Sequence, residues 1–219
     1  MRSRTACLLA LSLLVLAQAA HATGVIRGTV KPKPRPASAA AARKRGSEVT
    51  DAVIYVERLP DPVERKLNSH GFWFFRRVSP PRVRRLVEIQ HHFDPHVLAI
   101  AVGDRIEFQN LDRVYHSPFS VSVAKHFDIG KRLPGARETV TMDRPGVINL
   151  HCEIHPDMGG YVVVTPNHAF AFPNDLGQYR LLPLPPGTYT VHVFHPRWGE
   201  LQRKVEIAKN ADAALDLAY

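Results

Sequence analysis

The sequence predicts an all-β protein, and two features carry that prediction. Apolar and polar residues alternate over short stretches, which is the pattern of strands with one buried face. Turn signals such as Gly103-Asp104, Pro134-Gly135 and Pro145-Gly146 separate these stretches. A long amphipathic helix pattern is not evident in the sequence. The expected architecture is therefore a β-sandwich.

The N-terminus has the features of a secretory signal. Two arginines precede an apolar run at Ala6–Ala17, and the A-x-A motif Ala20-His21-Ala22 follows. The run is too short to span a membrane. We expect residues 1–22 to be removed on export to the periplasm. Cys7 would leave with them, so that Cys152 would be the only cysteine of the mature chain.

Residues 23–85 form the next expected region. Gly24–Val30 and Asp51–Glu57 are typical of strands, and they are expected to form a hairpin or an edge attached to the following domain. Between them, Lys31–Ser47 has the proline-, alanine- and base-rich composition of a linker. Aromatic residues at Phe72–Phe75 lie among arginines, and would either dock a partner or membrane or cover an edge of a core.

Regular strands are expected from Leu86 onward. Val97–Val102 is apolar on both faces, which indicates a central strand, and Arg105–Asn110 alternates as a half-buried strand does. Further strands are expected at Phe119–Ser122, Glu138–Met142 and Val147–His151.

After Thr165 the sequence predicts a second, smaller group of strands. They are Ala169–Phe172, Gly177–Leu182, Thr188–Phe194 and Arg203–Ile207. This part contains neither a Ser-His-Asp arrangement nor a carboxylate pair of catalytic type. We therefore expect a supporting module and a protein that is not an enzyme.

The stretch from His151 to Met158 holds the clearest chemical signal. Strand alternation brings Cys152 out on the apolar face while His151 points to the other face. Cys152, His155 and Met158 then offer a thiolate, an imidazole and a thioether within one loop, and this donor set suits copper. A trigonal copper site needs a second imidazole, for which His116 is the leading candidate. The alternative for Cys152 is a buried, inert thiol.

These residues resemble the cupredoxin family. The spacing Cys-x2-His-x2-Met is similar to the short ligand loop of amicyanin, and Val102–Asn110 followed by His116 is similar to the strand that delivers the first histidine in cupredoxins. More narrowly, the run from Phe93 to Val164 is similar to periplasmic plastocyanin-like proteins of the methylamine-utilisation type, and the whole resemblance covers about residues 86–195. The resemblance implies a Greek-key cupredoxin β-sandwich with one type 1 copper ion that cycles between Cu(I) and Cu(II). One departure is Ser117, where many cupredoxins have asparagine.

The residue patterns and the resemblance together predict a division of the chain. We expect a signal peptide at 1–22 and N-terminal strands with a linker at 23–85, and the resemblance implies a cupredoxin domain at 86–165 and a carboxypeptidase-regulatory-like β module at 166–219. The expected function is copper-binding electron transfer in the periplasm, with His116, Cys152, His155 and Met158 as metal ligands. A copper storage or delivery protein and a metal-free interaction module are the alternatives.

Charge and the remaining histidines bear on partners. Without Arg2 and Arg4, the 29 basic residues fall to 27 against 20 acidic ones. That balance favours an acidic redox partner or an anionic membrane surface, or serves solubility alone. Nucleic acid is not an expected partner of an exported chain without a recognition motif. His91, His92 and His96 are close in sequence and would form a second copper site or an access path, or are simply exposed.

Overall fold

The computed structural model describes residues 23–32, 49–68 and 81–219. Strands account for 54% of the structure and helix for 4%, which confirms the all-β fold class. The predicted signal peptide, most of the linker and the aromatic residues Phe72–Phe75 lie outside the described residues.

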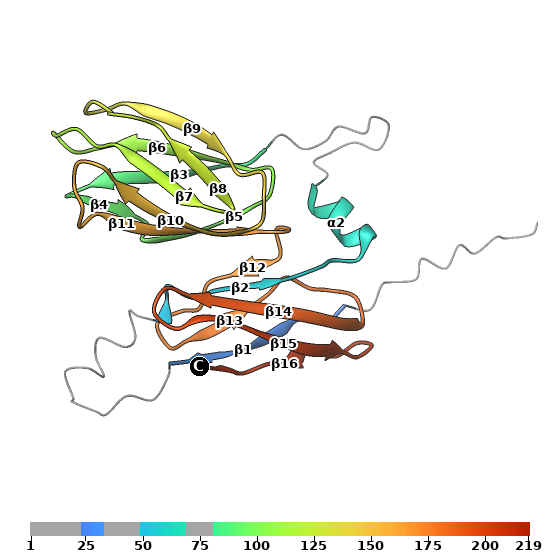
Figure 1. Ribbon diagram of the computed structural model, residues 1–219. Coiled ribbons are helices and arrows are strands. Elements are labelled where there is room, and N and C mark those ends of the chain that lie inside the picture. Colours follow the sequence, from blue (N-terminus) through green and yellow to red (C-terminus); the bar gives the residue numbers. More distant parts are fainter. Residues whose placement is uncertain (1–22, 33–48, 69–80) are drawn as a thin grey trace, which may run out of the picture.

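Residues 83–165 form a β-sandwich, called here the first sandwich. Its strands are β3 (Val83–Ile89), β4 (His92–Asp94), β5 (Val97–Ala101), β6 (Arg105–Asn110), β7 (Pro118–Ser122), β8 (Lys125–Asp128), β9 (Arg137–Thr141), β10 (Gly146–Cys152) and β11 (Gly159–Thr165). One sheet has the order β5-β11-β10-β7-β8 and the other the order β4-β3-β6-β9 (Figure 1). Within the described strands of this sandwich, the β5–β11 and β3–β6 pairs are parallel and the others are antiparallel. The predicted sandwich of two facing sheets is confirmed.

A second sandwich combines strands from both ends of the chain. Its strands are β1 (Ile26–Lys31), β2 (Val53–Val56), β12 (Phe170–Ala171), β13 (Gln178–Arg180), β14 (Gly187–His195), β15 (Gly199–Ile207), β16 (Ala213–Ala214) and β17 (Leu217–Ala218). One sheet has the order β12-β2-β14-β15, and the other has the order β13-β1-β16 with β17 also paired to β1. The helix α2 (Asp61–Asn68) follows β2.

The two N-terminal strands differ from both expectations, because they form neither a hairpin nor an edge of the first sandwich. β1 lies between β13 and β16, and β2 lies between β12 and β14. Close backbone approach fixes β1 in place, since a Cβ atom at Gly28 would collide with the carbonyl oxygen of Leu215. In the sequence, the first sandwich is thus inserted between the two parts of the second sandwich, as the colours of Figure 1 show.

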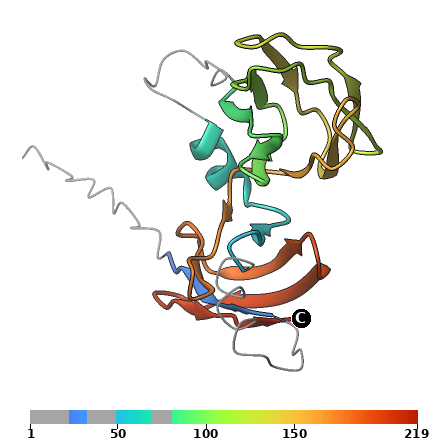
Figure 2. The ribbon, with the colours of Figure 1, turned by 90° about the vertical axis from the view of Figure 1, so that its left-hand side faces the viewer.

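The two sandwiches stack on each other, as Figures 1 and 2 show from two directions. Val97, Ala99 and Val163 on the outer face of the first sandwich pack against Val53 and Phe194 of the second. This contact buries a third apolar cluster between the two cores. Of the order of 25 cal/mol is gained for each Å² of apolar surface removed from water, so the cluster holds the sandwiches together.

The stacking also explains the apolar pattern of β5. That pattern was expected to mark a central strand, but β5 is at the edge of its sheet. Leu98 and Ile100 point into the core of the first sandwich, while Val97 and Ala99 meet the second. Both faces are therefore buried because another sandwich covers the sheet. Among the described residues, no helix is long and apolar enough to cross a membrane.

Candidate metal centre

Strand β10 delivers Cys152 to the interior of the first sandwich. Ile148, Leu150 and Cys152 are buried in its core, whereas His151 is exposed on the opposite face. This is the alternation that the sequence indicates. The loop after β10 turns back at once, with the Met158 N–H donating to the His155 carbonyl at 2.9 Å. Gly159 then pairs with His151 at the start of β11.

His116 reaches the same end of the sandwich from the loop between β6 and β7. Its backbone exchanges hydrogen bonds with Arg132, with N···O distances of 3.2 and 2.6 Å. Two residues later, Pro118 is paired with Cys152 across β7 and β10. This pairing brings His116 beside a thiol that is 36 residues away in sequence. The His116 side chain is 0% exposed.

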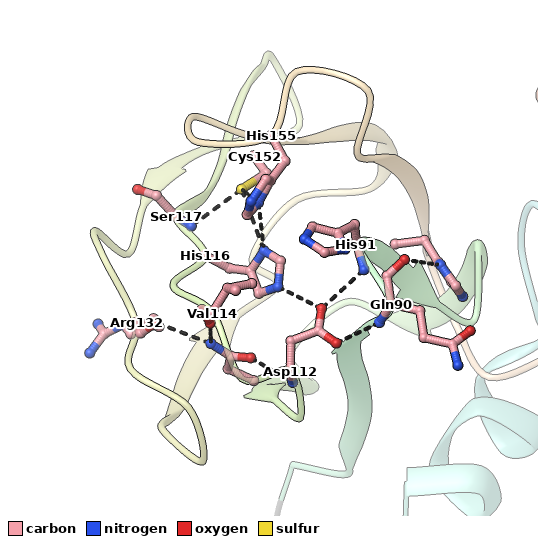
Figure 3. Close-up of polar contacts among 11 residues, drawn as sticks. Gln90, His91, Asp112, Val114, His116, Ser117, Arg132, Cys152 and His155 are labelled. Carbon is pink, nitrogen blue, oxygen red and sulfur yellow. Dashed lines mark hydrogen bonds and ion pairs between the residues drawn. The ribbon is translucent and has the colours of Figure 1, made fainter.

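Three donor atoms converge at this end of the sandwich (Figure 3). The Cys152 Sγ lies 3.9 Å from His116 Nδ1 and 3.8 Å from His155 Nδ1, and the two Nδ1 atoms are 3.1 Å apart. In the part of the chain that the structure describes, this is the one group of three such side chains with all donor atoms within 4.8 Å of each other.

The donor set fits a metal ion. Bonds of about 2.0–2.1 Å to imidazole nitrogen and about 2.3 Å to thiolate sulfur let two ligands of one ion lie up to roughly 4.4 Å apart. All three measured separations are shorter than that. One thiolate with two imidazoles suits copper. The fourth predicted ligand, Met158, is 1% exposed and belongs to the same core cluster as Cys152.

Asp112 orients the His116 ring. Its Oδ2 lies 2.8 Å from His116 Nε2, so that this nitrogen donates a proton and Nδ1 is left with its lone pair toward Cys152. Partial burial alone would raise the pKa of Asp112, but hydrogen bonds from His91, His116 and Gln90 outweigh it and lower that pKa. Asp112 is therefore a carboxylate at neutral pH. Sequence reasoning did not single it out.

The serine after His116 leaves the thiol with a hydrogen bond. The Ser117 backbone N–H points at Cys152 Sγ from 3.4 Å, and the Ser117 hydroxyl donates to Glu153 Oε2 at 3.2 Å. The donor to sulfur is thus a backbone group. Replacing the asparagine common in cupredoxins by serine does not remove it.

The other histidines separate from one another in the fold. His91 lies at the site, with its ring centroid 4.7 Å from that of His155. His96 instead pairs with Asp51 at 3.1 Å, and His92 Nδ1 contacts the Gln90 carbonyl at 3.0 Å. His91, His92 and His96 therefore do not share a second metal site among the described side chains.

The pKa of His155 is lowered. Desolvation is the largest cause, and the neighbouring imidazoles of His116 and His91 add to it. The lowered pKa favours the neutral ring that binds metals.

Glu88 is a second carboxyl group behind the site. It is 1% exposed, and neither of its carboxyl oxygens has a hydrogen-bond partner among the described residues. Burial, together with the Asp112 charge, raises its pKa to about 7, against a smaller opposing effect of Arg132. The folded state therefore binds more protons than the unfolded state between the ordinary pKa of 4.5 and about 7. The free energy of unfolding falls as pH rises across that interval.

Glu88→Gln should remove this pH dependence. We expect the variant to gain up to about 3 kcal/mol of unfolding free energy over the parent at pH 8, where the parent must bury a charge. At pH 4 both side chains are neutral and the two proteins should differ little. Urea denaturation at the two pH values measures this, and an equal difference at both would contradict the assignment of the buried charge to Glu88.

Comparisons with known proteins give matches among solved structures. No protein-family model and no curated protein matches the sequence. A purple cupredoxin from Nitrosopumilus maritimus is 25% identical over 37% of this chain and 98% of that chain, with a TM-score of 0.34. A copper-containing nitrite reductase from Thermus scotoductus is 29% identical over 38% of this chain and 22% of that chain, with a TM-score of 0.35.

A Cu(I) structure of an amicyanin mutant is also similar. It is 20% identical over 37% of this chain and 81% of that chain, with a TM-score of 0.36. These TM-scores are low, and each match covers well under half of this chain. Any functional proposal therefore rests on the side chains of the metal centre and not on these structural matches.

Proposed function

We propose that this chain is a copper-binding electron-transfer protein of the cupredoxin type. The observation that carries the proposal is the convergence of one thiol and two imidazole Nδ1 atoms within 3.9 Å of each other. His116, Cys152 and His155 would hold the metal, with Met158 as the weak axial ligand. When bound, copper would accept and release one electron by changing between Cu(II) and Cu(I).

The protein frame would keep the ligands in one arrangement during that exchange. Cys152 is fixed at the end of β10, and His116 is fixed by the backbone bonds to Arg132 and by Asp112. Burial of both side chains excludes water from the site. His155 is half-buried and is the ligand nearest to solvent. This arrangement supports an electron carrier, because electrons can pass to a partner through the edge of the partly exposed His155 imidazole.

Copper titration of the metal-free mature chain tests the proposal. An intense thiolate-to-copper absorption band in the red part of the visible spectrum is the expected result. Copper binding without that band would favour the storage or delivery function. Absence of copper binding would leave the metal-free interaction module, and would refute the proposed function.

The axial ligand makes a separate prediction. Met158→Gln should lower the reduction potential and change the visible spectrum while copper stays bound, because a thioether favours Cu(I) more than a harder oxygen donor does. His155→Ala is the comparison variant, and it should weaken copper binding strongly because an equatorial ligand is lost. Protein-film voltammetry of the copper-loaded proteins measures the potential. A wild-type potential in Met158→Gln would exclude Met158 as the axial ligand.

The proposed location is the periplasm, and the proposed partner is an acidic redox protein. Support comes from the signal-like sequence of residues 1–22 and from the excess of basic residues. Sequencing the N-terminus of periplasmic material tests the location, with Thr23 expected near the first position. Electron-transfer rates that do not change with salt would argue against charge steering by the partner.

A further inference from the structure

The turn between β3 and β4 has an unusual backbone. Ile89 pairs with His92, so that Gln90 and His91 form a two-residue hairpin connection. Their φ angles are 51° and 62°. A turn with two positive φ angles normally uses asparagine, aspartate or glycine, and other residues adopt this region only at an energetic cost. The fold therefore holds His91 in place at an energetic cost.

The Asp112 carboxylate offsets this cost. It accepts the Gln90 N–H at 2.6 Å and the His91 N–H at 3.0 Å. The same carboxylate contacts His116 Nε2 at 2.8 Å. One side chain thus fixes both the turn and a predicted metal ligand, as Figure 3 shows. The position of His91 is consequently tied to the position of His116.

The turn aims the His91 ring at the metal centre. Its edge meets the His155 ring at a centroid distance of 4.7 Å and an angle of 85°, and the His116 ring at 5.9 Å and 76°. Solvent exposure decreases from His91 toward the buried donors. His91 is exposed, His155 is half-buried, and His116 and Cys152 are 0% and 3% exposed. From solvent, the first imidazole on the way to the buried donors is therefore His91.

We propose that His91 is a loading ligand, which binds copper at the surface and passes it to His155 and then to the buried donors. This inference rests on the proposed function. An imidazole is a strong donor for copper, and its exposed place lets it replace a water ligand before the ion leaves solvent. His91 is not part of the group whose donor atoms lie within 4.8 Å of each other. It therefore acts on the rate of loading and not on the final complex.

The same contact would also suit a cap that shields His155. The two roles predict opposite effects of removing the imidazole. A loading ligand speeds copper uptake, so uptake slows when it is lost. A cap obstructs uptake, so uptake becomes faster.

The test is copper uptake by the metal-free mature chain with His91→Asn. Asparagine tolerates positive φ, so the turn is kept while the imidazole is lost. His126→Asn is the matched control, because His126 is an exposed imidazole on β8. Equimolar Cu(II) is added, free copper is quenched with a chelator at set times, and protein-bound copper is measured after gel filtration. This readout depends on neither colour nor activity.

We expect His91→Asn to load about tenfold more slowly or worse, a size typical of losing a partner of a metal site. Its final copper content and spectrum should equal those of the wild type, and His126→Asn should load at the wild-type rate. Unchanged or faster loading by His91→Asn would overturn the inference. His91→Gly, which also accepts this backbone, serves if the asparagine variant is misfolded by circular dichroism. Failure of the proposed function differs, because the wild type itself would then take up no copper.

Discussion

Cys152→Ser is expected to abolish the visible absorption of the copper-loaded protein and to reduce Cu(II) affinity by more than about 100-fold, since losing even an outer partner of a metal ligand costs 10–100-fold. A thiolate would be the softest of the donors that converge here, and it would be the source of the expected charge-transfer band. Cys152 is the one free cysteine among the described residues. No second thiol there can take its place.

The fold should survive the substitution. Cys152 occupies the end of β10, and serine is similar in size and can accept the hydrogen bond from the Ser117 N–H. Circular dichroism and thermal melting check the fold, and a competition titration with a chelator measures affinity. Ser117→Ala is the comparison variant, because it keeps the backbone donor and should keep the band. Retention of the full band in Cys152→Ser would refute a thiolate-copper centre.

The sequence predicted the first sandwich well because its information is local. Alternation along β10 indicates the side on which Cys152 lies, and the turn signals mark where strands end. Short loops then bring strand ends to one end of the sandwich. The meeting of His116 with Cys152 and His155 follows from these rules together with the donor chemistry. The spacing of the loop after Cys152 indicated His155 and Met158 as further ligands.

Strand partners far apart in the sequence were not predictable in the same way. The residues of β1 alternate as many strands do, and nothing in them specifies a partner near Tyr179 or Ala213. Pairing there depends on strands that lie about 150 residues or more away in the sequence, which a local pattern does not specify. The prediction that β5 is a central strand was wrong for a related reason. An edge strand that a second sandwich covers is buried on both faces, so it has the apolar composition of a central strand.

Asp112 and Glu88 were missed for a different reason. They come from a loop and a strand, and each matters through a contact that only the tertiary structure creates. His91 was singled out only as one of three neighbouring histidines, and its contact with His155 was not predictable. A sequence signal exists for one of them: an aspartate four residues before a candidate histidine is within reach of its ring. At Gln90 and His91, the sequence argues against a turn with two positive φ angles, because neither residue is typical of such a turn.

Asp112→Asn is the second substitution with a large expected effect. The carboxylate accepts hydrogen bonds from Gln90, His91 and His116. An asparagine amide has one oxygen and turns an N–H donor toward at least one of these donors, so it cannot replace all three bonds. His116 would lose the partner that fixes its tautomer. We expect copper affinity to fall about 10–100-fold.

Stability should fall as well, because the same carboxylate holds the turn at positive φ. Hydrogen bonds to a charged group are worth about 1.5–3 kcal/mol, so a loss of roughly 2 kcal/mol in unfolding free energy is expected. Asp128→Asn is the matched control, since Asp128 accepts the Gly130 N–H at 2.8 Å in an exposed turn of the same sandwich. That variant should lose less stability and no copper affinity. Chelator competition and urea denaturation measure the two quantities. If Asp112→Asn bound copper as tightly as the parent, the carboxylate would not be what orients His116.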